Sequence, residues 1–256
     1  MNFSEKTAVV TGGSRGLGRA ICLELARGGA NVVLCYAGNE VAANETVAAC
    51  ESLGAKAVAI RCDVSKEDEV KALMDAALKT FGRIEILVNN AGISAREPLY
   101  QYDPAAFKNI MDLNVTAVFN GCRAVAPIMK AQGGGVILNA SSFAALDPNA
   151  GRATYSAAKA AVKNLSASMA AEFAAANIRV LAYVPGMIAT EIAAESIEKY
   201  GDALLADIPC RRFGTPEDLG KVLVFLASDA AGYMNGCHVE ISGGKRCVQN
   251  PQFSYQ

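Results

Sequence analysis

Three side chains at fixed spacing are suited to acid–base chemistry. Tyr155 and Lys159 are four residues apart, and Ser142 lies thirteen residues before the tyrosine. An alanine-rich stretch from the tyrosine to about residue 176 is typical of a helix, so Tyr155 and Lys159 share one helix face. A free tyrosine has a pKa of about 10, and lowering it by three units requires roughly 4 kcal/mol. Because a cation in a dry cleft supplies energy of that order, the pattern predicts a phenol that exchanges protons near neutral pH.

The chain offers few alternatives to this centre. Its single histidine, His238, lies in the segment 237–241, which alternates like a strand, so we interpret it as a structural or surface residue. Catalytic mechanisms that pair a histidine with a serine or cysteine nucleophile therefore have few candidate residues in this chain. The eight cysteines show no CxxC pair and no zinc spacing, and most lie in apolar segments. We expect reduced core thiols, and the sequence predicts no metal site.

The bulk composition excludes several classes of partner. Hydrophobic residues make up 52% of the 256 residues, which is ample for a buried sheet, and the net charge is −1. No basic field favours nucleic acid or a membrane surface, and no apolar run approaches the ~20 residues of a membrane span. The first residues lead into a strand without a secretory signal pattern, and no linker interrupts the chain. We expect one cytoplasmic domain over 1–256 that acts on a small molecule.

Predicted strands and helices alternate along the whole chain. Strands are expected at 7–11, 31–36, 57–62, 84–89, 135–140, 179–184 and 237–241. Helices are expected at 17–28, 40–53, from an N-cap at Ser65 to about 81, at 104–130, from 155 to about 176, and at 216–228. Apolar strands separated by helices form parallel sheets. The pattern predicts an α/β fold: a single-domain, Rossmann-like, doubly wound parallel sheet of about seven strands with helices on both faces.

A glycine-rich turn at 11–18 directly follows the first predicted strand and opens the next helix. Glycines in such a turn let the backbone approach a pyrophosphate, and the helix N-terminus attracts the anion. A plain tight turn would use the same residues, but the place after the first strand favours nucleotide binding. The residues of this turn expected to bind a cofactor are Gly12, Ser14, Arg15, Gly16, Leu17 and Gly18.

Further motifs follow in order along the chain. They are the turn spacing TGxxxGxG, then Asn89-Asn90-Ala91-Gly92, Asn114, Ser142, Tyr155-x-x-x-Lys159 and Pro185-Gly186. On these motifs the chain resembles the short-chain dehydrogenase/reductase family over nearly its whole length, from about residue 6 to 244. The resemblance implies an NAD(P)-dependent oxidoreductase that acts on CH–OH or C=O groups.

The resemblance assigns roles to four catalytic residues. Tyr155 would give a proton to a carbonyl, or take one from an alcohol, and Ser142 would polarise the substrate oxygen. Lys159 would bind the nicotinamide ribose and lower the pKa of Tyr155. Asn114 would hold a water that relays protons to Lys159. The alternative for Asn114 is a polar helix residue that satisfies backbone groups.

It also places further cofactor contacts. Asp63 and its neighbour Val64 would meet the adenine, although an aspartate at a strand end can simply cap the next turn. The segment Asn90, Ala91 and Gly92 would support the sheet and touch the adenosine ribose. Under the nicotinamide would lie Pro185 and Gly186, while Thr190 would contact its carboxamide or the pyrophosphate.

The end of the second strand favours NADP(H) over NAD(H), which stays possible. NAD-binding relatives carry an acid there, which accepts from the ribose hydroxyls and would repel a 2′-phosphate. This chain instead reads Cys35-Tyr-Ala-Gly-Asn39, and Arg15 in the glycine turn can meet the phosphate. In the alternative, Arg15 is solvated and Asn39 binds a ribose hydroxyl.

Within the family, the chain is most similar to 3-oxoacyl-acyl-carrier-protein reductases and small NADPH ketone reductases, through the segments 212–218 and 225–229. Basic residues that would meet an acidic carrier are missing near the ends of the long helix and the Tyr155 helix, where only Lys130 is charged favourably. We therefore predict an NADPH-dependent ketone reductase. Alternatives are 3-oxoacyl reduction, hydroxysteroid or sugar-alcohol oxidation, and a non-catalytic NADP-sensing protein.

Two further regions and the oligomeric state complete the expectations. A partly apolar lid is expected at about 187–215, with its mobile part at 193–209. The tail 245–256 is longer than in most carrier-protein reductases, and either disorder or a reach into a neighbouring subunit is open. The resemblance also implies a homotetramer.

Overall fold

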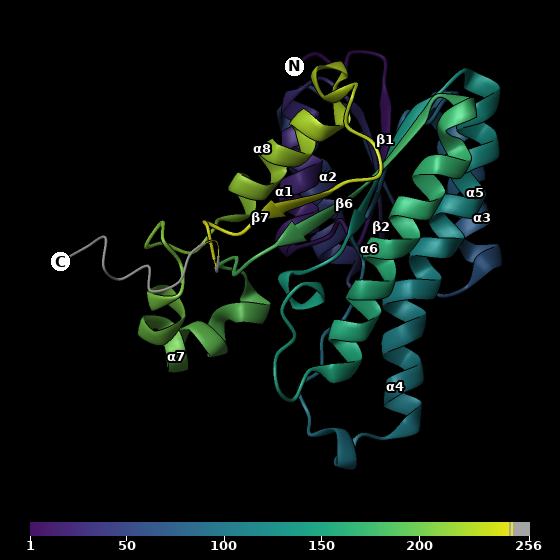
Figure 1. Cartoon of the computed structure of the whole chain (residues 1–256). Coiled ribbons are helices and arrows are strands. Elements are labelled where there is room, and N and C mark those ends of the chain that lie inside the picture. Colours follow the sequence, from purple (N-terminus) through teal and green to yellow (C-terminus); the bar gives the residue numbers. More distant parts are fainter. Residues whose placement is uncertain (246, 248–256) are drawn as a thin grey trace.

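A seven-stranded parallel sheet forms the centre of the computed structural model, which describes residues 1–245 and 247 (Figure 1). Its strand order is β3-β2-β1-β4-β5-β6-β7, and each neighbouring pair is parallel. The chain first builds the sheet outward from β1 to β3, then returns to the other side of β1. The strands are β1 (Thr7–Thr11), β2 (Asn31–Tyr36), β3 (Ala57–Arg61), β4 (Ile86–Asn89), β5 (Gly135–Ala140), β6 (Ile178–Pro185) and β7 (His238–Ile241).

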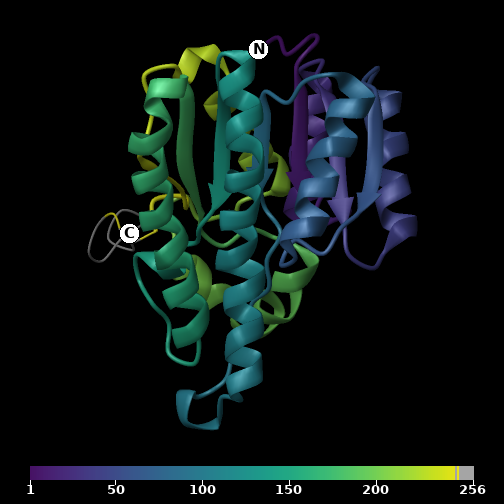
Figure 2. The same ribbon diagram turned by 90° about the vertical axis from the view of Figure 1, so that its right-hand side faces the viewer.

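Helices cover both faces of the sheet, as two separate apolar clusters require (Figures 1 and 2). One face packs against α1 (Gly16–Arg27), α2 (Glu40–Ser52) and α8 (Pro216–Ala227). The other packs against α3 (Glu67–Phe81), α5 (Ala117–Gln132) and α6 (Ala153–Phe173). Because β1, β4 and β5 alternate residues between these two clusters, their strands are buried on both faces, which confirms the predicted fold class.

The helix ends follow local sequence signals. Pro216 begins α8 after Thr215, whose side chain accepts from the Asp218 N–H while the Asp218 carboxylate accepts from the Thr215 N–H. Gly82, with a φ of 80°, ends α3 in the left-handed conformation that glycine adopts at low cost. These caps fix where α8 begins and where α3 ends.

Two predicted elements differ from the structure. Ser65 does not cap α3, which begins at Glu67 after Lys66; the Ser65 hydroxyl instead donates to Asp63 Oδ1 at 2.7 Å. The helix predicted at 104–130 is interrupted: α4 (Pro104–Met111) is followed by a π-helical turn (Asp112–Thr116) and then by α5. Other boundaries shift by one to three residues, and the Tyr155 helix ends in a 3₁₀ turn (Ala174–Ala176).

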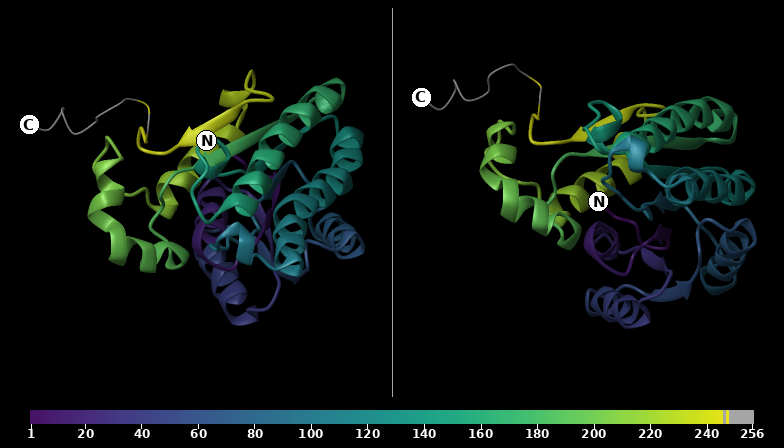
Figure 3. Two further views of the ribbon diagram at one scale, coloured as in Figure 1. Left: turned by 60° about the horizontal axis from the view of Figure 1, so that its bottom comes forward. Right: turned by 90° about the horizontal axis from the view of Figure 1, so that it is seen from below.

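The predicted lid contains a 3₁₀ turn (Glu191–Ala193) and α7 (Ala194–Ala206), which is kinked at Tyr200 and has no buried residue. Figure 3 shows α7 to one side of the packed layers. Both ends of the region are joined, since Ile188 pairs with Gly214 in a parallel bridge. Most of the predicted tail, residues 246 and 248–256, lies outside the described residues.

The remaining predictions concern cysteines, the histidine and membranes. Five cysteines are buried, at 22, 35, 50, 62 and 122, whereas Cys210 and Cys247 are exposed and Cys237 is partly buried. His238 is exposed on β7. Among the residues that the structure describes, no helix combines the length and apolar character of a membrane span.

Candidate active site

The predicted catalytic and cofactor-binding residues gather at the carboxyl ends of the central strands. In Figure 2 the strand arrowheads point toward the end of the molecule from which α4 extends. The strand order reverses between β1 and β4, because the chain runs outward on one side and then continues on the other. In open α/β sheets, ligands bind at this switch point, outside the carboxyl ends of the strands.

Ser142 and Tyr155 meet at the end of β5. Ser142 follows the strand in an extended conformation and begins a 3₁₀ turn (Phe143–Ala145), where its Oγ accepts from the Ala144 N–H at 3.2 Å. Tyr155 lies in the first turn of α6, and its side chain shares a hydrogen bond with Ser142. Ser142, which the sequence singled out at a separation of thirteen residues, thus lies beside Tyr155, and its contact with a substrate oxygen stays a prediction.

The acidity of Tyr155 differs from the expectation. Burial raises its pKa above the ordinary value, and the Ser142 hydrogen bond and the Arg152 charge oppose this only in part. Lys159 Nζ lies 5.7 Å from the centre of the tyrosine ring. The predicted lowering of the tyrosine pKa by Lys159 is thus wrong for this arrangement, because desolvation of the phenol outweighs the nearby charges.

Lys159 is buried, with 4% of its surface exposed. Its Nζ donates a 2.9 Å hydrogen bond to the Ala140 carbonyl, and its own carbonyl accepts from the Ser141 hydroxyl. Burial lowers the pKa of Lys159 to about 8. Ser141, adjacent to Ser142, therefore anchors α6 to β5 and leaves Ser142 as the serine paired with Tyr155.

Asn114 is placed by the π-helical turn. Its Nδ2 donates to the carbonyls of Ile93 and Ile110, both at 2.9 Å, so it joins the loop after β4 to the end of α4. Its Oδ1 is buried and has no hydrogen-bond partner among the described residues. A Cβ at Gly92 would lie 2.5 Å from this oxygen and 3.4 Å from Lys159 Nζ. The missing side chain of Gly92 therefore leaves both polar groups accessible from one small space.

The glycine-rich turn is tightly packed between β1 and α1. Gly12 and Gly16 have φ values of 66° and 55°, and a Cβ at Gly18 would lie 2.0 Å from the Gly12 carbonyl oxygen. Arg15 precedes α1 and provides no side-chain cap, and the first turn of the helix has no acidic residue. The N–H groups of this helix start are therefore available to an anion. Ser14 and Leu17 belong to the same turn.

The end of β4 is joined to the end of β1. The Thr11 hydroxyl accepts from the backbone N–H groups of Asn90 and Ala91, at 2.9 and 3.0 Å. Asn90 Nδ2 donates to the Thr11 carbonyl at 3.0 Å, and its Oδ1 accepts from the Tyr183 hydroxyl at 3.3 Å. These bonds confirm the supporting role predicted for Asn90, because its side chain holds the sheet together at the switch point.

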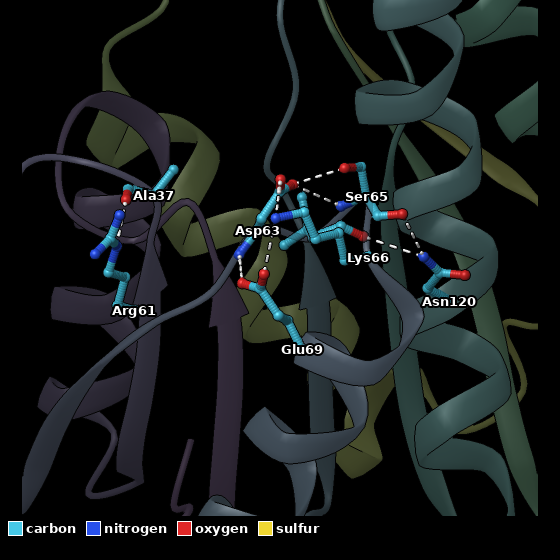
Figure 4. Close-up of polar contacts among 8 residues, drawn as sticks. Ala37, Arg61, Asp63, Ser65, Lys66, Glu69 and Asn120 are labelled. Atoms are coloured by element: carbon cyan, nitrogen blue, oxygen red, sulfur yellow. Dashed lines mark hydrogen bonds and ion pairs between the residues drawn. The ribbon is translucent and has the colours of Figure 1, made fainter.

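Asp63 lies in a polar network at the end of β3 (Figure 4). Its Oδ1 accepts from the Ser65 hydroxyl and N–H, and Lys66 Nζ lies 3.6 Å from its Oδ2. The Asp63 N–H donates to Glu69, while Asn120 donates to the carbonyls of Val64 and Ser65. The Ser65 hydrogen bond holds the pKa of Asp63 below its ordinary value. This is the turn-capping role of a strand-end aspartate, and an adenine contact remains a prediction.

At the end of β2, the described structure holds a cation and no acid. Asn39 Oδ1 accepts from the Ala42 N–H, so this side chain caps α2. Arg61, the last residue of β3, donates through Nε to the Ala37 carbonyl at 3.3 Å (Figure 4). Sequence reasoning missed Arg61, because a charge at a strand end is usually a solvated residue; only the β2–β3 register could have placed it here.

Arg15, the cation that the sequence predicted for the phosphate, has a carboxylate neighbour. Arg15 lies 3.9 Å from Glu191, at the start of the lid region, and both side chains are largely exposed. Pro185 is the last residue of β6 and Gly186 follows it, where a Cβ would lie 2.8 Å from Ser242 Cα. Thr190 precedes the 3₁₀ turn of the lid. The structure thus brings the predicted residues of β6 and the glycine turn to the same edge of the sheet.

Comparison with known proteins gives a consistent result. The model of the short chain dehydrogenase family matches residues 6–201. The chain is 38% identical over 239 residues to a 3-oxoacyl-[acyl-carrier-protein] reductase of Staphylococcus epidermidis, covering 93% of this chain and 98% of that protein. It is 40% identical over 248 residues to a 3α-hydroxysteroid dehydrogenase of Mediterraneibacter gnavus, covering 96% and 99%.

The fold is also found among solved structures. A 7α-hydroxysteroid dehydrogenase in complex with NADH and 7-oxo glycochenodeoxycholic acid superposes with a TM-score of 0.91 at 37% sequence identity. The similarity covers 95% of each chain.

Proposed function

The chain belongs to the short-chain dehydrogenase/reductase family and is an oxidoreductase of CH–OH or C=O groups; from this premise we propose that it reduces a ketone to a secondary alcohol with NADPH, reversibly. The observation that carries the proposal is the hydrogen bond between Ser142 and Tyr155, beside the buried cation of Lys159. A non-catalytic nucleotide sensor would not need this set.

The residues of the site fit a dinucleotide. A side chain at Gly18 would clash with the backbone of Gly12, so the turn has room for backbone atoms alone. The start of α1 offers unpaired N–H groups to a pyrophosphate. The unpartnered Oδ1 of Asn114 and the ammonium of Lys159 face the side-chain-free position of Gly92, which suits hydroxyl groups of a ribose or a water. A bound nicotinamide nucleotide supplies the hydride that the carbonyl carbon receives.

The proton comes from this chain. Tyr155 donates its phenolic proton to the carbonyl oxygen, and the raised pKa of the phenol keeps that proton in place before the reaction. Ser142 donates a hydrogen bond to the same oxygen and so stabilises the charge that develops on it. The Lys159 ammonium then returns a proton toward the tyrosine, and a water held by Asn114 would reprotonate the lysine from solvent. The proposed roles are supported by the position of these side chains near the carboxyl ends of β4 and β5.

The preference for NADPH rests on the charge at the end of β2. A 2′-phosphate bound there would meet Arg61 and Arg15, and no acid follows β2 before Glu40. A guanidinium binds phosphate oxygens through paired hydrogen bonds, which favours NADPH over NADH. Asn39 is used as a helix cap, so it does not replace the acid of NAD-binding relatives.

A second candidate is the reduction of 3-oxoacyl groups on an acyl-carrier protein, which the similarity to the Staphylococcus epidermidis enzyme favours. Against it, Lys130 near the end of α5 is exposed, but Glu172 near the end of α6 is exposed as well. An acidic carrier would meet mixed charge there rather than a basic patch.

One panel separates the two candidates. NADPH consumption is measured with a 3-oxoacyl thioester and with free ketones, including a steroid ketone. The proposal expects turnover on the free ketones, with the thioester much slower. Comparable turnover on the thioester would restore the carrier-protein role, and no turnover on any carbonyl, with NADPH binding intact, would favour the sensor.

We also expect a homotetramer. Phe107 on α4 and Phe119 on α5 are 47% and 46% exposed, and large apolar side chains on one helical segment favour contact between copies. Sedimentation velocity tests this, and a monomer at micromolar concentration would contradict it.

A further inference from the structure

The C-terminal segment that follows β7 lies against the end of the lid. The Cys210 N–H donates to the Gly243 carbonyl at 3.1 Å. A Cβ at Gly243 would lie 2.9 Å from Ile208 Cγ2 and 3.5 Å from Cys210 Cβ, and a Cβ at Gly244 would lie 3.3 Å from Pro209 Cγ. The two segments are therefore in close contact, and the glycines leave the space that this contact needs.

Each of these two segments places a cysteine at the contact. Cys210 Sγ lies 3.9 Å from the point where a Cβ at Gly243 would be. Cys247 Sγ lies 3.3 Å from the corresponding point at Gly244, and Pro209 Cβ lies 3.4 Å from that same point. The Cys247 sulfur is thus close to the residue that directly precedes Cys210. Two thiols that are far apart in the sequence therefore share one small region of the surface.

Both thiols are accessible to a reagent in solution. Cys210 and Cys247 are exposed, and they lie in a turn and a bend rather than in a regular element. The core thiols differ, because burial raises the pKa of Cys50 to about 11 and that of Cys122 to about 12. Since the thiolate is the reactive form, buried and protonated thiols react slowly. An oxidant is therefore expected to reach the exposed pair first.

The contact lies between the lid and the proposed active site. Cys210 follows α7 and precedes the bridge that joins the two ends of the lid. In the C-terminal segment, Lys245 Nζ lies 5.4 Å from the centre of the ring of Phe143, which follows Ser142 directly. A covalent bond between Cys210 and Cys247 would therefore hold the end of the lid to a segment that already contacts the Ser142 turn.

We propose that Cys210 and Cys247 form a reversible disulfide under peroxide, and that this bond restrains the lid. One thiolate attacks hydrogen peroxide, becomes a sulfenic acid and releases hydroxide; the other thiol attacks that sulfur, forms the S–S bond and displaces water. The two sulfurs lose two electrons, which reduce the peroxide. The sulfurs must approach to about 2.05 Å, which the turn and the bend permit by local adjustment. The effect on turnover rests on the proposed ketone reduction, whereas formation of the bond does not.

Peptide mapping tests the bond itself. The full chain is treated with hydrogen peroxide, free thiols are blocked with iodoacetamide, and the digested protein is analysed by mass spectrometry. We expect a linked peptide pair that contains Cys210 and Cys247 and is absent after treatment with dithiothreitol. On a denaturing gel without reductant, the oxidised chain should migrate as a monomer. A disulfide-linked dimer, a bond between other cysteines, or oxidation without any bond would each overturn the inference.

Trypsin tests the restraint of the lid without a substrate. Lys199 is exposed on α7, inside the lid. Cleavage after Lys199 should be roughly threefold or more slower in the oxidised protein, because proteolysis follows the population of the opened segment. With the best ketone of the panel, kcat should fall by a similar factor and recover on reduction, since lid opening limits turnover in many enzymes. A mapped disulfide that changes neither rate would contradict the restraint.

Serine variants identify the two thiols. Cys210→Ser and Cys247→Ser should each keep the activity of the reduced enzyme and lose the response to peroxide. Cys237→Ser, at a partly buried cysteine just before β7, should respond as the wild type does. A wild-type response in either of the first two variants would refute the assignment. If no ketone is reduced at all, the proposed function fails, while a mapped bond with slower cleavage after Lys199 would still support the restraint.

Discussion

The ammonium group of Lys159 lies 2.9 Å from the carbonyl oxygen of Ala140, to which it donates a hydrogen bond at the end of β5. A buried lysine needs such an acceptor, because an unpaired charge away from water is costly. The bond directs the cation to the strand end, 5.7 Å from the centre of the Tyr155 ring. The lysine is therefore held at the junction of α6 and β5, where protonation affects both stability and the site.

Replacing Lys159 by methionine should remove a pH dependence of stability. Burial lowers the pKa of Lys159 to about 8, whereas an unfolded lysine titrates near about 10.4. Between these values the unfolded state binds more protons, so the free energy of unfolding rises with pH; below about pH 8 both states are protonated and the cost is present in full. From urea unfolding, the wild-type-minus-variant difference should grow by on the order of 3 kcal/mol across this window. A difference that is flat with pH would contradict this expectation.

Tyr155→Phe should abolish most of the activity without loss of nucleotide binding. The change removes the hydroxyl that shares a hydrogen bond with Ser142 and would donate the proton. Loss of a general acid lowers kcat by about 10²- to 10⁴-fold. NADPH affinity, followed by nucleotide fluorescence, should stay within a few-fold of wild type. Tyr233→Phe, at a fully exposed tyrosine, serves as the control, and near-normal turnover in Tyr155→Phe would remove this residue from the reaction.

Gly18→Ala should damage the turn that receives the pyrophosphate. The added Cβ would lie 2.0 Å from the Gly12 carbonyl oxygen, so the backbone of the turn must move. Overpacking of this kind costs typically 1–3 kcal/mol of stability, and NADPH binding should weaken at the same time. Gly201→Ala in α7 has no atom within 4 Å of the new Cβ and should be neutral or slightly stabilising. A Gly18→Ala protein that binds NADPH normally would show that the turn is not needed for the nucleotide.

Ala37→Asp should shift the cofactor preference toward NADH. The new carboxylate would follow β2 directly and repel a 2′-phosphate, while it could accept from ribose hydroxyls. Arg61→Ala should weaken NADPH binding roughly tenfold, the value of one charge-assisted hydrogen bond, and change NADH binding little. Isothermal titration with both nucleotides measures these effects. If Ala37→Asp and Arg61→Ala both keep the wild-type ratio of NADPH affinity to NADH affinity, other residues set the cofactor preference.

The strands were predictable because they are buried on both faces. The expected bounds 7–11, 31–36 and 135–140 agree with β1, β2 and β5 residue for residue. Continuous apolar runs between turn signals leave little freedom in where such strands begin and end. The proposed catalytic residues could likewise be recognised, because the spacing of Ser142, Tyr155 and Lys159 reflects one strand end and one helix face.

Features that depend on tertiary contacts were not predictable. The π-helical turn has no local signal, since Asn114 is held there by the carbonyl of Ile93 in another segment. Ser65 resembles a helix cap in sequence, but its hydroxyl donates to the Asp63 carboxylate instead of capping α3. The pKa of Tyr155 depends on how completely the fold removes water from the phenol, and a sequence gives no measure of that.

The π-helical turn at Asp112–Thr116 means that this segment contains one residue more than a regular helix would need. Deleting Val115 would let α4 and α5 join in a continuous helix, with far-ultraviolet circular dichroism close to that of the wild type. The surfaces of α4 and α5 would keep their relative orientation, because the deletion removes the residue that a regular helix does not need, while Asn114 would lose its position in the turn. Asn114 and the helix surfaces of α4 and α5 could then not both keep their present orientations. One surplus residue thus separates a helix that merely covers the sheet from one that also contributes a side chain to the site.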